Sequence, residues 1–224
     1  VSRPVTLLRK ASPSLTPPPR EANHALPDDE EDQVITRKTP EDPVDHEKLD
    51  EINALLKDVA AAGSMEFLTE LLVNTMRSYQ DVMEIQELCL SYIWDLCKFN
   101  DANKSAIMSA GLPEDIIKAM KLFKQSVKVQ ECACGALWSL SVNQFNRIEL
   151  VRIGAVERIF RALEMHLKME AFVEVAFGAL RTLSPDPEVR VSIGQLLGAH
   201  RVCRAMGLHR QSTSIQRDGC AFLS

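Results

Sequence analysis

The sequence predicts an all-α solenoid, in which similar helical units stack side by side, because one phrase recurs at a regular period. The segment VQECACGALWSLS (129–141) has a counterpart 44 residues earlier, IQELCLSYIWDLC (85–97), and another in register 43 residues later, VEVAFGALRTLS (173–184). A fourth copy, QRDGCAFLS (216–224), keeps the same register. A period in the low forties, with helical spacing of apolar residues in the copies, is typical of helical repeat proteins.

A second phrase supports the same period. A glycine followed by Leu or Ala stands at Gly111, Gly154 and Gly198, and a helical phrase follows each one: EDIIKAMKLF, ERIFRALEMH and HRVCRAMGLH. Because glycine adopts the left-handed backbone conformation that side chains resist, we expect a tight turn between two helices at each glycine. Each unit should therefore contain a short helix, a medium helix and a longer third helix.

The predicted units follow a segment of different composition. Residues 1–45 hold most of the eleven prolines and an acidic run at 28–32, with few residues that could form a core. This composition predicts a disordered tail. The repeat region should start near His46 and comprise units at about 46–98, 99–142, 143–185 and 186–224. Because the fourth unit stops inside its third helix, we expect the natural chain to continue.

Local signals place the helix ends. In the first unit Gly63 separates two runs with helical spacing, and Asp81 with Glu84 three residues later resembles a capping box for the third helix. In the second unit, Asn103 is a candidate N-cap. Three further residues mark later helix starts. Pro113 suits the first turn of a helix, Ser126 can act as an N-cap, and Pro187 suits the first helical position.

The third helices carry the predicted core. Large apolar residues of the second unit recur at three- and four-residue steps and form one stripe: Val129, Cys132, Ala133, Ala136, Leu137 and Leu140. The six cysteines lie in helical phrases, mostly on such stripes: Cys89, Cys97, Cys132, Cys134, Cys203 and Cys220. This spacing predicts buried thiols in a reducing compartment rather than a disulfide framework, and so an intracellular protein of the cytoplasm or nucleus.

The pattern resembles the armadillo repeat family, which has three helices per repeat, a glycine between the first and second, and a third helix reading roughly Q-E-x-A-x-x-A-L-W-x-L. The resemblance implies a right-handed superhelix whose third helices line a concave groove that binds partner proteins. The HEAT repeat, with two helices per unit, is the alternative architecture. In importin-α-like members, a tryptophan and an asparagine four residues later clamp an extended peptide. Trp94 and Trp138 match the tryptophans, but the asparagine positions hold Lys98, Val142 and Pro185, so nuclear-import cargo binding is not expected.

The sequence shows no catalytic pattern. It contains no GxGxxG, P-loop, HExxH or GxSxG motif. Cys132 and Cys134 point about 200° apart on a helix and should not share a metal. His166 and His209 end the second helices of two units, where we expect them to cap carbonyl groups. The prediction is a non-catalytic protein with no metal and no cofactor.

Composition limits the partner. The formal net charge of −5 and the pI of about 5.6 argue against a nucleic-acid-binding face. No apolar run approaches the roughly 18 residues that a membrane span needs. We therefore expect a protein partner.

One face of the third helices is the candidate groove. Its predicted residues are Glu87, Trp94, Lys98, Glu131, Trp138, Glu174, Arg181 and Arg217. The three glutamates occupy equivalent positions beside two tryptophans, which suits an extended segment with spaced basic residues. The basic positions call for acidic groups at the other end of the partner. In the alternative interpretation, the tryptophans only pack between helices and the glutamates are solvated. The predicted function is a protein-interaction scaffold, or else the regulatory region of a larger enzyme such as a kinase or ubiquitin ligase.

Overall fold

The computed structural model describes residues 46–185, 187–196 and 198–224. The predicted disordered tail, residues 1–45, lies outside this range. The described residues form twelve α-helices and no strand, which confirms the all-helical prediction for this part of the chain. The helices are α1 (His46–Ala61), α2 (Met65–Ser78), α3 (Met83–Cys97), α4 (Asp101–Ser109), α5 (Leu112–Leu122), α6 (Val127–Leu140), α7 (Gln144–Arg152), α8 (Ala155–His166), α9 (Glu170–Leu183), α10 (Pro187–Gln195), α11 (Gly198–Leu208) and α12 (Thr213–Leu223).

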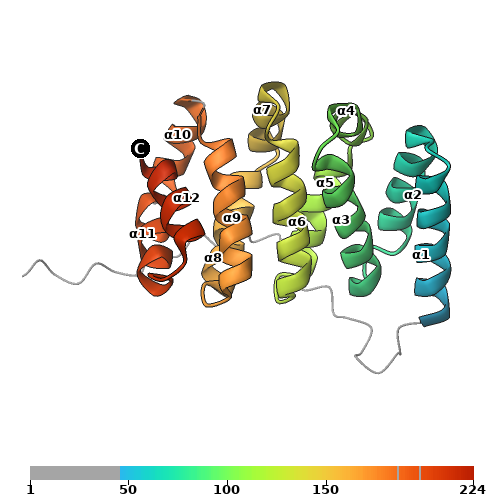
Figure 1. The fold of residues 1–224 in the computed structure, drawn as a ribbon, viewed down its shortest axis with the longest axis horizontal. Coiled ribbons are helices and arrows are strands. Elements are labelled where there is room, and N and C mark those ends of the chain that lie inside the picture. Colours follow the sequence, from blue (N-terminus) through green and yellow to red (C-terminus); the bar gives the residue numbers. More distant parts are fainter. Residues whose placement is uncertain (1–45, 186, 197) are drawn as a thin grey trace, which may run out of the picture.

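The helices follow one another in four groups of three. Their third members, α3, α6, α9 and α12, pack in that order and lie side by side across one face in Figure 1. The second members lie behind them, and α4, α7 and α10 lie at one edge. The predicted unit boundaries, after residues 98, 142 and 185, fall in the segments that connect one group to the next. The face of third helices is therefore built from segments about 43 residues apart.

Two of the predicted glycine turns have the expected backbone. Gly111 (φ 74°) and Gly154 (φ 86°) are left-handed and directly precede α5 and α8. Gly198 differs, because it is the first residue of α11 rather than the residue before the helix. A methyl group there would lie 2.6 Å from Cγ2 of Ile193 and 2.8 Å from Cζ of Phe160. Close packing therefore requires a glycine at position 198.

The helix starts follow the sequence signals in part. Ser126 caps α6 by accepting a hydrogen bond from the Val129 amide, and Pro113 lies in the first turn of α5. The N-cap of α4 is Asn100 rather than Asn103, whose side chain instead donates to the Leu96 carbonyl at 3.0 Å. The predicted capping box before α3 does not form, since the N-cap is Val82, which makes no side-chain cap bond.

A repeated glutamine joins the second and third helices of three groups. The side-chain amide of Gln130 donates to the carbonyls of Met120 at 3.0 Å and Phe123 at 3.1 Å. Gln86 and Gln216 make the equivalent pair of bonds in the first and fourth groups. Carbonyls at a helix end have no partner within the helix, so these amides satisfy them. The sequence repeat showed the glutamines but not this role.

The two histidines bind carbonyls of the preceding group. His166 Nε2 lies 2.8 Å from the Lys124 carbonyl oxygen, and His209 Nε2 lies 2.7 Å from that of Leu167. The carbonyls follow α5 and α8, one group earlier than the helices that the histidines end. The predicted capping is therefore present, but it links neighbouring groups rather than closing the histidine's own helix.

The cysteine prediction is wrong at two positions. Cys89, Cys97, Cys132 and Cys134 are buried, but Cys203 and Cys220 are exposed. Helices α11 and α12 pack against α8 and α9 on one side, so part of each remains open. A helical stripe shows which residues share a face, and it does not show whether another helix covers that face.

Candidate interaction surface

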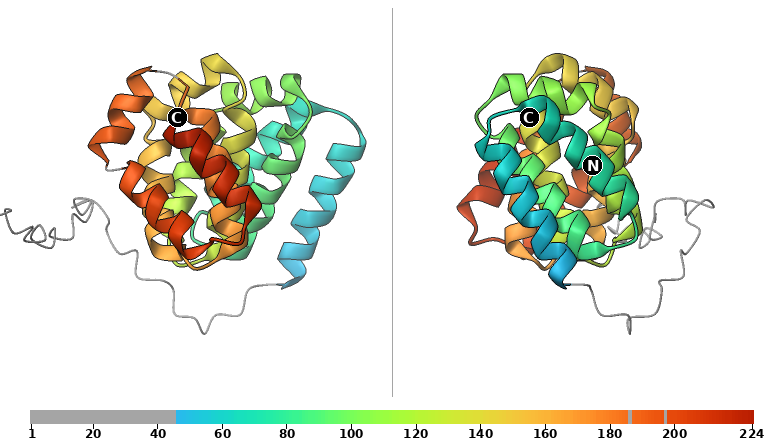
Figure 2. Two further views of the ribbon diagram at one scale, coloured as in Figure 1. Left: turned by 60° about the vertical axis from the view of Figure 1, so that its left-hand side comes forward. Right: turned by 90° about the vertical axis from the view of Figure 1, so that its right-hand side faces the viewer.

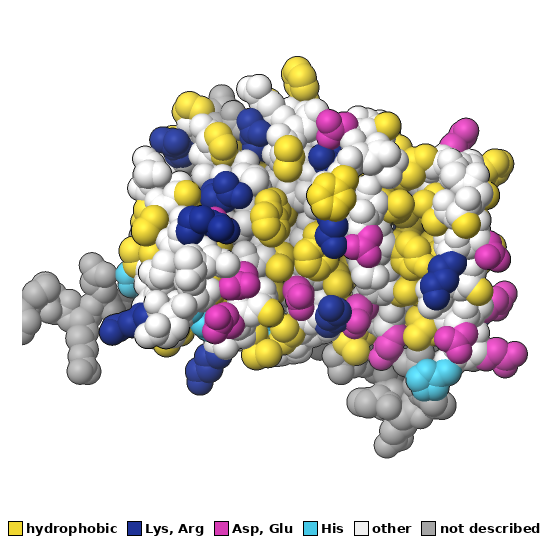
Figure 3. All heavy atoms as spheres, in the orientation of Figure 1, with side chains coloured by type: hydrophobic (Ala, Val, Ile, Leu, Met, Phe, Trp, Pro, Cys, Tyr) yellow, Lys and Arg dark blue, Asp and Glu magenta, His cyan; other side chains and the backbone are white. Residues whose placement is uncertain are grey.

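The face formed by α3, α6, α9 and α12 carries the predicted groove residues. In Figure 3, which has the orientation of Figure 1, acidic side chains cross its lower half over α3, α6 and α9. Basic side chains gather over α9 and α12 at the left of the view. The face therefore has an acidic region and a basic region rather than one uninterrupted acidic row.

The acidic region centres on Glu87 of α3 and Glu131 of α6. Both side chains are half-buried. Burial raises the pKa of Glu87 above its usual value, and the charges of Glu84 and Glu131 raise it further. Lys128 lies close enough to oppose this shift. The structure thus brings two of the three predicted glutamates within electrostatic range of each other.

The third glutamate has an opposite charge beside it. Glu174 of α9 accepts a hydrogen bond of 2.7 Å from Ser212, the N-cap residue of α12. The Glu174 charge also contributes to the raised pKa of Arg217. Because Glu174 already has these contacts, it is less able than Glu87 and Glu131 to bind a basic side chain of a partner.

Trp94 packs against the next group instead of standing free in the groove. Its half-buried ring lies over Gly135 of α6, where an added methyl group would overlap Cδ2 and Cε2 of the indole. The Lys98 ammonium lies 4.6 Å from the ring centroid and 2.7 Å from a carboxylate oxygen of Asp95. A cation from the same helix thus already occupies the position over Trp94 that we predicted for a partner's basic group.

Trp138 repeats this packing one group later. Its half-buried ring lies over Gly178 of α9, at 2.8 Å from the position that a Cβ would take. The residue equivalent to Lys98 is Val142, which is 57% exposed. An apolar side chain therefore replaces the cation that stacks on Trp94. Of the two tryptophans, Trp138 is the better candidate for a contact with a basic partner.

A buried aspartate organises the basic region. Asp218 of α12, whose side chain is 5% exposed, lies 2.9 Å from Arg217 and 3.4 Å from Arg181. The hydrogen bond and the charge of Asp218 raise the pKa of Arg217. Arg181 Nε is buried and makes no hydrogen bond. Two guanidinium groups thus share one buried carboxylate, and Glu174 supplies a second carboxylate near Arg217.

Sequence reasoning missed Asp218, although its position contained a signal. The equivalent residues in the three earlier groups are Leu88, Cys132 and Val175. A carboxylate at a helix position that is otherwise apolar requires a partner when buried. The nearby arginines supply it.

Exposed apolar side chains lie next to the C-terminal ends of α3 and α6. Phe99 is 96% exposed and Phe145 is 82% exposed, and Val142 lies between α6 and α7. Large apolar groups grouped on a surface are typical of interaction sites. The sequence analysis placed Val142 on the groove face, but it did not predict Phe99 and Phe145, because these two fall outside the repeated phrases.

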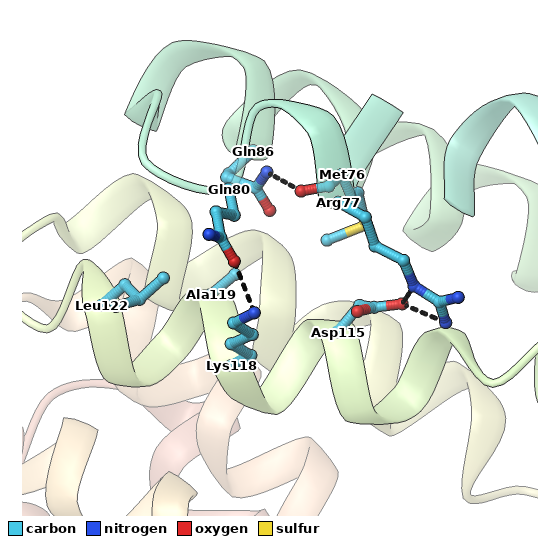
Figure 4. A pocket seen from close by; sticks show the side chains of 8 residues that line it. All are labelled: Met76, Arg77, Gln80, Gln86, Asp115, Lys118, Ala119 and Leu122. Atoms are coloured by element: carbon cyan, nitrogen blue, oxygen red, sulfur yellow. Dashed lines mark hydrogen bonds and ion pairs between the residues drawn. The ribbon is translucent and has the colours of Figure 1, made fainter. Parts of the chain in front are cut away.

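A hollow on the second helices is too small for a ligand. It lies between α2 and α5, where Arg77 and Asp115 form an ion pair at 3.0 Å and Lys118 donates to Gln80 (Figure 4). Its volume is about 10 Å³, close to the minimum for one water molecule. These contacts join the first group to the second and form no candidate site.

Two findings concern residues 46–185, 187–196 and 198–224 as a set. They contain no cluster of three or more His, Cys, Asp or Glu side chains placed to bind a metal ion. No helix among them has the length and apolar character to cross a membrane.

Comparisons with known proteins give a structural match. No protein-family model matches the chain, and no curated protein matches it. The crystal structure of an engineered protein from the Northeast Structural Genomics Consortium superposes with a TM-score of 0.60 at 20% sequence identity. The match covers 76% of this chain and 65% of that one. At this identity the likeness shows the fold alone.

Proposed function

We propose that this chain is a non-catalytic protein-interaction scaffold of the armadillo type. In this proposal the four helix groups are repeats of a right-handed superhelix, and the third helices line a concave groove that binds an extended segment of a partner. The recurring phrases and the ordered packing of α3, α6, α9 and α12 support the proposal. We place the protein in the reducing cytoplasm or nucleus, because its six cysteines are free thiols and four of them are buried.

The observation that carries the proposal is the pairing of Glu87 with Glu131. Two half-buried carboxylates of like charge lie within electrostatic range, with Lys128 nearby. Partial desolvation and the like charges of Glu84 and Glu131 both disfavour the ionised form of Glu87. A basic side chain of a partner would relieve both effects by charge-assisted hydrogen bonding, so this pair is the proposed centre of recognition.

The charge distribution on this face favours one orientation of the bound segment. The acidic pair lies over α3 and α6, whereas the guanidinium groups of Arg181 and Arg217 lie on α9 and α12. A segment with basic residues at one end and an acidic residue at the other would complement the face in one orientation. Neighbouring packed helices are about 10 Å apart. A polyproline II segment rises about 3.1 Å per residue and has three residues per turn, so basic side chains at every third position face the same way and fit successive helices.

The test uses a fluorescent twelve-residue peptide with lysine at every third position and small polar residues elsewhere. Binding is measured by fluorescence anisotropy at low and physiological salt, because exposed charge pairs weaken as ionic strength rises. We expect binding that Glu131→Lys weakens at least tenfold. Trp138→Ala combined with Glu131→Lys should abolish it while the helical circular dichroism is retained.

Two controls make the test specific to the face. A peptide of the same composition with its lysines adjacent should bind more weakly. Asp58→Lys changes the charge by the same amount on α1, outside the third helices, and should leave binding unchanged. Equal weakening by Asp58→Lys and Glu131→Lys would show that net charge alone attracts the peptide, and the proposal would then be wrong.

A further inference from the structure

An apolar groove lies at the end of the molecule formed by α1 and α2. Its volume is about 290 Å³, and it is lined by Leu55, Val59, Phe67, Glu70, Leu71 and Asn74. Leu55 is 47% exposed and Phe67 is 66% exposed. Figure 2 (right) shows this end, where α1 and α2 face the viewer. The groove is separate from the exposed face of the third helices.

This end differs from the rest of the stack. The second, third and fourth groups each pack against a preceding group, as α6 does on α3 and α9 on α6. Among the described residues, the first group has a neighbour on one side only. Terminal units of stacked helical proteins need a cap, because an uncovered apolar surface promotes association. Leu55 and Phe67 are the side chains that such a cap would cover.

We propose that residues 33–38 of the same chain (QVITRK) cover this groove. In this arrangement Val34 and Ile35 lie in the apolar groove, against Leu55 and Phe67. Arg37 and Lys38 lie against carboxylates of α1 and α2. The segment thus acts as an intramolecular cap on the first helix pair.

The length of the connection permits this placement. Leu55 lies nine residues into α1, a rise of about 14 Å from His46 at 1.5 Å per residue. Eleven residue-to-residue steps lead from Ile35 to His46, and they span at most about 36 Å when extended. The segment can therefore turn back along α1 and reach the groove. Val44, only two residues before α1, cannot reach it.

Charge selects this segment over others in residues 1–45. Helices α1 and α2 carry six carboxylates, Glu47, Asp50, Glu51, Asp58, Glu66 and Glu70, against three cations, Lys48, Lys57 and Arg77. Arg37 and Lys38 complement this surplus. Leu26 is followed by the acidic run at 28–32, which the same surface would repel. Leu7 and Leu8 are also apolar and have basic neighbours, but their longer connection costs more loop-closure entropy.

The experiment measures access to the groove with a thiol placed at its edge. Asn74 lines the groove and has an exposed side chain, so Asn74→Cys leaves the apolar wall intact. The full chain also carries Cys203→Ser and Cys220→Ser, which remove the two exposed native thiols. The labelling rate of Cys at position 74 by a thiol reagent should rise at least threefold when Val34→Ser and Ile35→Ser are added.

Matched variants decide between this cap and other occupants. Leu7→Ser with Leu8→Ser should leave the labelling rate unchanged, and circular dichroism should show the same helix content in every variant. Hydrogen exchange of the amides at 34–37 should be slower than in the Val34→Ser, Ile35→Ser variant. The proposal is overturned if the serine pair at 34 and 35 has no effect. It is also overturned if the labelling rate falls with protein concentration regardless of that pair, since a second copy would then cover the groove.

Discussion

The indole ring of Trp138 in α6 lies directly over Gly178 in α9, and a methyl group at Gly178 would lie 2.8 Å from Cδ2 and Cε2 of that ring. Trp94 and Gly135 repeat the relationship one group earlier. Each tryptophan thus packs closely against the third helix of the next group, because the glycine there has no side chain. The tryptophans hold neighbouring groups together, and Trp138 is also positioned at the candidate groove.

Because a tryptophan ring lies over each of these glycines, an alanine in place of the glycine should lower the stability of the protein, although alanine normally stabilises a helix. Gly135→Ala should destabilise the protein by about 1–3 kcal/mol, the usual range for overpacking. Helix propensity alone would favour the alanine by about 1 kcal/mol. For a domain of this size each kcal/mol lowers the melting temperature by about 2–4 °C. Thermal unfolding followed by circular dichroism measures the change.

Two variants test the cause of that loss. Gly207→Ala, in α11, places its methyl group where no atom lies within 4 Å, so it should leave stability unchanged or raise it. In a Trp94→Ala background, Gly135→Ala should no longer destabilise, and the double-mutant cycle should show a coupling. Equal effects of Gly135→Ala in both backgrounds would mean that the ring does not restrict this position.

The glutamine bonds between helices predict a second stability effect. Gln130→Leu removes both hydrogen bonds to the carbonyls at the end of α5. The Phe123 carbonyl keeps the hydrogen bond from the Ser126 amide at 3.0 Å, whereas the buried Met120 carbonyl loses its side-chain donor. The free energy of unfolding, measured with urea, should fall by about 1–3 kcal/mol. Gln125→Leu, at an exposed position two residues before α6, should change stability by less than about 0.5 kcal/mol.

Thiol reactivity should divide the six cysteines into two classes. Burial raises the pKa of Cys89 and Cys97 to about 12 and that of Cys132 to about 11, and it also raises the pKa of Cys134. A thiolate is the reactive form, so these four should label slowly in the native protein. Cys203 and Cys220 are exposed and should label quickly. Mass spectrometry of the partly labelled protein identifies the sites, and fast labelling of Cys134 would contradict its burial.

The raised pKa of Glu87 predicts a pH-dependent effect on stability. A carboxyl group whose pKa is higher in the folded state stabilises the fold most below its unfolded pKa. That contribution is lost as the pH rises through the folded pKa. Glu87→Gln should therefore raise the melting temperature at pH 7, by less than about 4 °C. The difference between variant and wild type should vanish near pH 3.

Asp95→Asn serves as the control for Glu87→Gln. Asp95 is exposed and pairs with Lys98, so its substitution should change the melting temperature little at pH 7. If Glu87→Gln instead lowered stability at neutral pH, the attraction to Lys128 would outweigh the burial of the carboxylate.

The repeated phrases determined much of this fold on their own. A period near 43 residues, the apolar stripe of 129–141 and the turn glycines at Gly111 and Gly154 predicted helices grouped in threes. These features are local, because the 3.6-residue period fixes which side chains share a helix face. The glutamates and tryptophans of the candidate groove could be placed on one such face for the same reason.

The contacts between helices were decided only by the tertiary structure. Whether Trp94 stands free or packs on Gly135 depends on the offset between α3 and α6, which no single helix specifies. The packing of α12 on α9 likewise brings Asp218 to Arg181, so that one carboxylate pairs with both Arg181 and its sequence neighbour Arg217. The sequence of a helix shows which residues share a face. The packing of neighbouring helices determines whether that face contacts water, a charged group or another ring.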